Sequence, residues 1–74
     1  MQLTVNGEVR EIAEGTTVSR LLEQLKISAE RVMVEVNLAI LKRAQCTSTM
    51  LNEGDQVEIV HFVGGGSSGT ISDG

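Results

Sequence analysis

The side chains of this chain that could do chemistry are few, and their spacing builds no catalytic site. Cys46 is the only cysteine and His61 the only histidine among 74 residues. A nucleophile needs a neighbouring base and a third group that orients the base, and nothing in the spacing pairs His61 with Cys46 or Ser48. We therefore expect His61 to be a half-exposed strand residue and Cys46 an ordinary loop thiol. The chain is predicted to have no catalytic residues and not to be an enzyme.

The carboxylates and the glycines predict no metal site and no nucleotide site. Glu53, Asp55 and Glu58 are spread over a turn and the start of a strand, where solvated surface carboxylates are expected. A metal site built from paired cysteines is excluded because there is only one cysteine. The glycines at 64–66 are followed by neither a helix nor a lysine, so they do not match a phosphate-binding loop. No bound metal or cofactor is expected.

The most distinctive stretch is 56–66, a predicted strand that runs without a turn signal into three glycines. Valine, isoleucine and phenylalanine favour a strand, and they stand here at Val57, Ile59, Val60, Phe62 and Val63. Glycine has no Cβ, so Gly64, Gly65 and Gly66 predict a flexible tail. Three extended residues reach roughly 10 Å, thin enough to enter a narrow cleft. Composition alone also fits a strand followed by a plain disordered linker.

Length, charge and composition limit the function classes further. A chain of 74 residues holds one small domain, and Phe62, its only aromatic residue, leaves the core to aliphatic side chains. A formal charge of −4 argues against nucleic acid, which requires a basic surface. No apolar run is long enough to span a membrane, and the first residues do not read as a signal peptide. We expect a soluble cytoplasmic protein.

Residues 2–26 predict a β-hairpin followed by a helix. Asn6-Gly7 is a strong signal for a two-residue type I′ turn, and the spacing of Val9 and Ile12 predicts a bulge or a strand end near Glu11. Thr16 or Thr17 is expected to cap the helix, which should end near Lys26. Its apolar residues fall at i, i+3, i+4 and i+7, the spacing of one buried stripe: Val18, Leu21, Leu22 and Leu25.

The second half of the chain predicts three more strands. They are expected at 31–37, 39–41 and 56–63, with a polar crossing loop and one helical turn within 44–51. One helix covers only one face of a sheet, so we predict an α+β fold, a mixed sheet of four or five strands with one main helix across one face. The domain is expected at 1–63, and 64–74 is expected to be a glycine-rich tail.

The last strand carries apolar residues toward both faces of the predicted sheet. If Val57 and Ile59 pack under the helix, Val60 and Phe62 are exposed on the open face. An exposed apolar patch with charges at its rim usually marks a docking site. We therefore predict that Val60 and Phe62 bind partners, with the basic pair Lys42-Arg43 as rim contacts.

At this point the sequence resembles a known family. The order of elements is similar to the ubiquitin-like β-grasp fold, and the whole of 1–66 resembles the ThiS family of bacterial sulfur carriers in thiamin biosynthesis. The resemblance rests on four stretches of the sequence: Asn6-Gly7, Thr17-Val18 with Leu21-Leu22, Val34 to Asn37, and the run from Glu53 to Gly66.

The resemblance implies a mechanism that needs no catalytic side chain. An adenylating enzyme related to ubiquitin-activating enzymes would use ATP to activate the carboxylate of Gly66, with Gly64 and Gly65 in the flexible tail. A sulfur donor protein would convert that end to a thiocarboxylate, and a thiazole synthase would receive the sulfur. Family members usually end at the glycine pair, whereas this chain continues through 67–74.

Three explanations for residues 67–74 stay open. A processing peptidase removes them in the cell, they were added for expression, or this copy does not carry sulfur. Two other functions also remain open: a sulfur carrier for cysteine or molybdopterin synthesis, and a ubiquitin-like interaction module that is never activated. The absence of proline disfavours the molybdopterin carrier, whose last strand typically leads into prolines.

Overall fold

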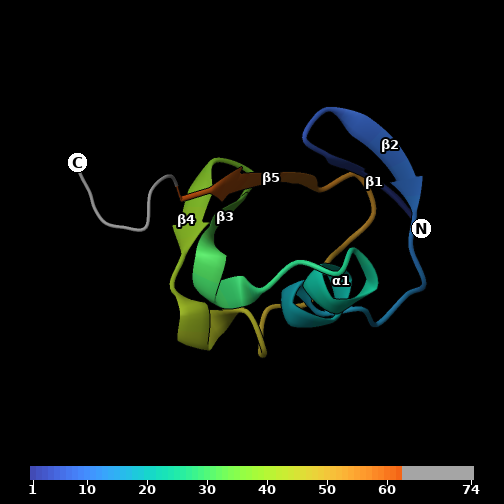
Figure 1. The fold of residues 1–74 in the computed structure, drawn as a ribbon. Helices are drawn as coiled ribbons and strands as arrows, with labels where there is room; N and C mark the ends of the chain where they lie inside the picture. Colours follow the sequence, from blue (N-terminus) through green and yellow to red (C-terminus); the bar gives the residue numbers. More distant parts are fainter. Residues whose placement is uncertain (63–74) are drawn as a thin grey trace.

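The apolar alternation of the sequence builds a five-stranded mixed sheet in the computed structural model, which describes residues 1–62. The strands lie in the order β2-β1-β5-β3-β4. The sheet carries α1 on one face only, as predicted (Figure 1). In chain order the elements are β1 (Gln2–Val5), β2 (Glu8–Glu11), α1 (Val18–Gln24), η1 (Ala29–Arg31), β3 (Val32–Val36), β4 (Ala39–Leu41), η2 (Arg43–Gln45) and β5 (Gln56–His61).

The first hairpin forms where the sequence predicts it. Asn6 and Gly7 have φ values of 52° and 81°, the left-handed conformation that both central residues of a type I′ turn require. The pairing of β1 with β2 is regular from Val5↔Glu8 to Gln2↔Glu11. Of the two alternatives near Glu11, the strand end is therefore the one observed, and Ile12 turns into the core.

The turn between β3 and β4 has the same left-handed conformation at both central residues, but its second residue is Leu38 where the first turn has Gly7. Asn37 and Leu38 have φ values of 53° and 73°, and the Leu38 side chain is 84% exposed. A left-handed conformation costs an ordinary residue about 1–2 kcal/mol, whereas glycine adopts it freely. Leu38 therefore strains the turn without contributing to the core.

We expect Leu38→Gly to stabilise the domain by about 1 kcal/mol, because glycine relieves the strain at this position. Urea unfolding followed by circular dichroism measures the change. The reverse exchange at the equivalent position of the first turn, Gly7→Leu, is the matched control and should destabilise by a similar amount. Equal stability of Leu38→Gly and the parent chain would contradict the assignment of strain.

The helix α1 begins and ends with recognisable caps. The Thr17 hydroxyl accepts a hydrogen bond from the Arg20 N–H at 3.2 Å, as an N-cap threonine does. At the other end the Ile27 N–H donates to the Leu22 carbonyl at 2.9 Å and the Lys26 N–H to the Glu23 carbonyl at 3.0 Å. With Lys26 at φ 60°, this is a Schellman motif. The helix therefore stops at Gln24, two residues before the predicted end.

The core lies between α1 and the inner face of the sheet and is aliphatic, as the single aromatic residue requires. Its fully buried members come from three elements, since Leu3, Val18, Leu21, Leu22 and Val57 are all at most 1% exposed. Cys46 follows η2 and is buried in the same cluster, so it is a core thiol rather than an ordinary loop thiol.

Asp55 is buried, so the prediction that it is a solvated surface carboxylate is wrong. Its relative exposure is 8%. One carboxylate oxygen accepts from the Asn37 side-chain amide at 3.0 Å, and the other accepts from the Asn52 N–H at 2.8 Å. A carboxylate is buried where hydrogen bonds replace its water. Asp55 therefore organises the turn that leads into β5.

Candidate functional site

The central strand β5 leads directly toward the glycines and is held on both sides. It runs parallel to β1 and antiparallel to β3. β1 pairs with β5 only as far as Val5↔Val57, because the chain then enters the hairpin turn. The Asn6 side chain continues the pairing beyond that point. It accepts from the Ile59 N–H at 2.7 Å and donates to the Ile59 carbonyl at 3.2 Å.

A second turn asparagine holds the start of β5 in a similar way. The Asn37 side chain accepts from the Gln56 N–H at 2.9 Å and donates to the Asp55 carboxylate. Both asparagines therefore have two functions, since each adopts a positive φ and each bonds to β5. The sequence predicted Asn6 as a turn residue only, because a side chain that bonds across 53 positions leaves no local signal.

We expect Asn6→Gly to destabilise the domain by about 1–3 kcal/mol. Glycine keeps the positive φ, so the variant removes only the two bonds to Ile59 and leaves that backbone partly unsatisfied. Chemical unfolding gives the free energy, and amide hydrogen exchange at Ile59 should accelerate more than exchange at Leu3. An unchanged exchange rate at Ile59 would show that the side-chain bonds do not hold β5.

The last described residue, Phe62, is still fixed to the sheet. Its N–H donates to the Arg31 carbonyl at 2.9 Å, which continues the antiparallel pairing of β3 with β5 beyond Val32↔His61. The predicted strand residue Val63 and the predicted tail residues Gly64, Gly65 and Gly66 lie outside the described residues. The domain thus anchors the chain up to four residues before Gly66.

The face of the sheet opposite α1 is open and partly apolar. Val60 is 49% exposed and Phe62 is 64% exposed, as the alternation along β5 predicted. Met33 pairs with Val60 on the neighbouring strand, and Ile40 on β4 is also exposed. Among the elements of 1–62, none covers this face (Figure 1). It is therefore available as a surface on which another molecule docks.

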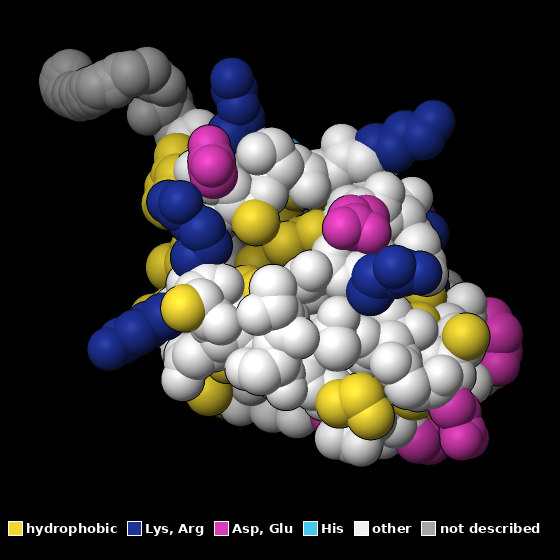
Figure 2. Space-filling model, turned by 90° about the horizontal axis from the view of Figure 1, so that it is seen from below, with side chains coloured by type: hydrophobic (Ala, Val, Ile, Leu, Met, Phe, Trp, Pro, Cys, Tyr) yellow, Lys and Arg dark blue, Asp and Glu magenta, His cyan; other side chains and the backbone are white. Residues whose placement is uncertain are grey.

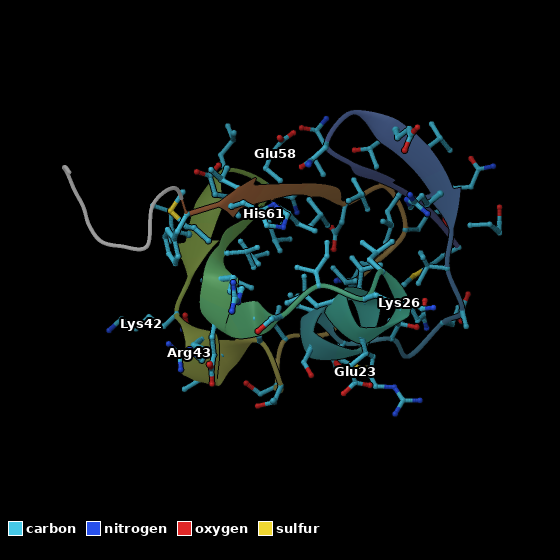
Figure 3. The ribbon with its side chains drawn as sticks, in the orientation of Figure 1. Glu23, Lys26, Lys42, Arg43, Glu58 and His61 are labelled. Carbon is cyan, nitrogen blue, oxygen red and sulfur yellow. The ribbon has the colours of Figure 1, made fainter. Side chains whose placement is uncertain are left out.

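The basic pair does not lie on the open face beside Val60. Lys42 and Arg43 project from the side of the molecule where β4 passes into η2, below the level of the sheet in Figure 3. Arg43 lies 3.9 Å from the Glu30 carboxylate and lines a groove of about 210 Å³. Phe62 borders the same groove. The structure thus brings Arg43 close to Phe62 at the edge of the open face, whereas Val60 does not line this groove.

The groove belongs to a depressed face of the domain. It and a second, wider depression share Glu30, Arg43 and Cys46 in their walls. Figure 2 shows the α1 side of the domain, on which apolar side chains form the floor of a hollow between charged ones. The wider depression lies beside η1 and η2, whereas the groove extends to Met33 and Phe62 at the edge of the open face.

The described residues show no arrangement suited to catalysis. Burial raises the pKa of the Cys46 thiol, and its Sγ lies 3.7 Å from the Lys42 carbonyl, so it is protonated and a poor nucleophile at neutral pH. His61 is exposed and reaches toward the α1 side of β5 (Figure 3). Within 1–62, no three potential ligands are grouped to hold a metal ion. No helix in this range is long and apolar enough to cross a bilayer.

Comparisons with known proteins agree on one family. The model of the ThiS family matches residues 3–66. The sulfur carrier protein ThiS of Escherichia coli is 32% identical over 66 residues, which are 89% of this chain and 100% of that protein. A crystal structure of the thiamine biosynthesis protein ThiS from Geobacter metallireducens superimposes with a TM-score of 0.78 at 43% identity, covering 89% of this chain and 100% of that one.

Longer proteins also contain a similar region. A thiazole synthase of Paramagnetospirillum magneticum is 42% identical over 67 residues, and one of Magnetococcus marinus is 42% identical over 66 residues. These stretches make up 90% and 89% of this chain but only 21% and 20% of those proteins. The chain thus spans about a fifth of the length of each thiazole synthase.

Proposed function

Because the chain belongs to the ThiS family of sulfur carriers for thiamin biosynthesis and has its ubiquitin-like β-grasp fold, we propose that it carries sulfur as a thiocarboxylate on Gly66. The observation that carries this proposal is the family match itself, which extends through Gly66. The β5 strand leads to that residue through a short stretch ending in three glycines.

The proposed reaction takes place at the main-chain carboxyl group of Gly66. A carboxylate oxygen attacks the α-phosphorus of ATP, and pyrophosphate leaves to give an acyl adenylate. Sulfur then displaces AMP from the carbonyl carbon and leaves a thiocarboxylate. Where the sulfur arrives as the terminal atom of a persulfide, a thiol must afterwards reduce the S–S bond. ATP is thus a substrate of the activating partner and not a cofactor of this chain.

Covalent geometry explains why so small a domain suits this chemistry. From Phe62, which is bonded to β3, four further residues reach at most about 14 Å when extended. Side chains along this stretch would obstruct a narrow active site, whereas Gly64, Gly65 and Gly66 add none. The domain contributes recognition, and its partners contribute the catalytic groups.

The chemistry also requires a free carboxylate at Gly66. While Ser67 is attached, the Gly66 carbonyl belongs to an amide, which cannot attack ATP as a carboxylate does. We therefore propose that a peptidase hydrolyses the bond between Gly66 and Ser67 before activation. The sulfur carrier is then the chain of residues 1–66.

Three partners follow from this reaction. An adenylating enzyme activates Gly66, a sulfur donor protein supplies the sulfur, and a thiazole synthase accepts it. The similarity to part of two thiazole synthases supports the last of these. Val60 is proposed to contact a partner from the open face, and Phe62 with Lys42 and Arg43 from the adjoining edge, where Phe62 and Arg43 border one groove.

The proposal is tested with the chain of residues 1–66 and its cognate adenylating enzyme. ATP–pyrophosphate exchange measures the first step, and the intact mass after addition of a sulfur donor measures the second. We expect exchange that depends on the carrier and a mass in which one oxygen is replaced by sulfur. Pyrophosphate exchange that stays at the level of the enzyme alone would overturn the proposal.

A further inference from the structure

The strand β4 covers only part of the edge of β3. The Phe62 N–H donates to the Arg31 carbonyl, so the odd-numbered residues of β3 direct their backbone groups toward β5. Hydrogen-bonded positions alternate along an antiparallel ladder, and the even-numbered residues of β3 therefore face β4. The pairing of these two strands ends at Val34↔Leu41. The next even-numbered residue, Val32, lies beyond the end of β4.

Val32 therefore directs its N–H and C=O groups toward an edge that has no neighbouring strand. Within residues 1–62, neither group is in a backbone hydrogen bond. The residue is nevertheless only 7% exposed. Backbone polar groups at buried positions are almost always paired. One donor and one acceptor of the sheet are thus available to another segment of extended chain.

The groove of about 210 Å³ lies along this edge of β3. Val32, Met33 and Val34 line it from the strand, and Leu41 and Phe62 line it from the neighbouring elements. Strand addition combines main-chain hydrogen bonds at a sheet edge with pockets that accept alternate side chains. The edge and the groove together supply both requirements.

We propose that residues 70–72 of this chain add to β3 as a short strand opposite Val32 and place Ile71 in the groove. The docked segment closes the intervening residues into a loop that contains the bond between Gly66 and Ser67. Exposed loops are preferred sites of proteolysis, so the loop presents the bond that the proposed peptidase cuts. In this last respect the inference rests on the proposed function.

The sequence of the segment suits a strand that borders an apolar groove. Ile71 is the only large apolar residue after Val63, and Thr70 precedes it. Both are β-branched, and such residues favour strands. Since side chains alternate along a strand, the side chain of Asp73 lies on the same side of the extended segment as that of Ile71.

The charges at the groove are complementary to Asp73. Lys42 and Arg43 stand on the side of the molecule where β5 ends (Figure 3), and Arg43 lines the groove together with Glu30. The two cations exceed the single carboxylate by one positive charge. The ion pair of Arg43 with Glu30 is long, at 3.9 Å, and both side chains are exposed. An exposed pair of this kind is weak, so the guanidinium can also bind Asp73.

The chain is long enough to reach this edge. Phe62 borders the groove, so the chain leaves β5 beside the proposed site. The eight residues 63–70 span at most about 26–29 Å. A segment on the far side of β3 lies two strand spacings from β5, or about 10 Å. The glycines at 64–66 and 69 allow the chain to reverse its direction.

The tether favours this segment over a second copy of the chain. A segment joined by a short flexible linker has an effective concentration in the millimolar range. A second copy would have to offer a strand edge of its own, such as β2. Three of the four residues of β2 are charged, namely Glu8, Arg10 and Glu11, and charges on an edge strand oppose pairing with another sheet.

Amide hydrogen exchange at Val32 tests the proposal in the chains 1–74 and 1–66. Exchange should be roughly tenfold slower in the longer chain, because the added segment accepts a hydrogen bond from this N–H. Ile71→Gly in the longer chain should restore the rate of the shorter one. Ser68→Gly, in the loop, is the matched control and should keep the protection. The Leu3 amide serves as the internal reference and should exchange equally in all four chains.

Equal exchange at Val32 in the chains 1–74 and 1–66 would overturn the proposal. Protection that is lost on dilution would assign the edge to a second copy and would overturn it as well. Protection that survives Ile71→Gly would show that this residue does not fill the groove. Thiocarboxylate formation by the 1–66 chain is measured separately. That chain lacks the docking segment, so failure of the docking proposal leaves the proposed function untouched, and the reverse also holds.

Discussion

A chain that ends at Gly66 is expected to become a thiocarboxylate, whereas the same chain continued to Gly74 is expected to stay unchanged. The difference should be all-or-none, because the longer chain presents an amide at Gly66 and has no carboxylate to adenylate there. Both chains are incubated with ATP, the adenylating enzyme and a sulfur donor. Intact-mass spectrometry then counts the fraction in which sulfur has replaced oxygen.

Two controls separate chemistry from recognition. Both chains contain the described body, 1–62, so both should bind the adenylating enzyme, and the longer chain should inhibit activation of the shorter one. A chain that ends at Gly65 retains a glycine carboxylate but is shorter by one residue, and it should be activated more slowly. Efficient sulfur incorporation at Gly74 of the uncut chain would contradict the assignment of Gly66.

Val57→Asp is expected to abolish the fold. Val57 is 0% exposed and lies on β5 between β1 and β3, so the carboxylate has neither water nor a cation to stabilise it. Burying an unpaired charge costs several kcal/mol, and a domain of this size has only about 3–5 kcal/mol of stability. Circular dichroism should show no cooperative thermal transition.

Val60→Asp makes the same chemical change three residues later and is the matched control. Val60 points to the open face and is 49% exposed, so the new carboxylate stays in water and the domain should remain folded. The two variants together test the alternation along β5. A cooperative transition in Val57→Asp, or its loss in Val60→Asp, would show that the two faces have been assigned the wrong way round.

Most of the fold could be predicted because short-range patterns determine it. Asn6-Gly7 located the first turn, the i, i+3, i+4, i+7 stripe located the helix, and the alternation along β5 correctly separated Val57 from Val60. The end of α1 was predicted two residues too late, because the Schellman motif there uses Lys26 instead of the usual glycine. The short helix η1 was not predicted.

Features that join distant residues could not be predicted from one sequence. The burial of Asp55 depends on Asn37, the bond from Asn6 reaches Ile59, and the pairing of Glu35 with Glu58 depends on the register of β3 against β5. None of these leaves a local pattern. The residue types and their spacing did not identify the chemistry of the site. Its proposed reactive group is a main-chain carboxylate, which only the family resemblance identified.

The central position of β5 affects how the protein is made. A ribosome delivers the hairpin, the helix and the second hairpin first, yet β1 and β3 have no strand between them until residues 56–61 emerge. The sheet can therefore be completed only after β5 has been synthesised. A chain that lacks β5 would leave β1 and β3 unpaired with each other and would also lack the residues proposed to be activated.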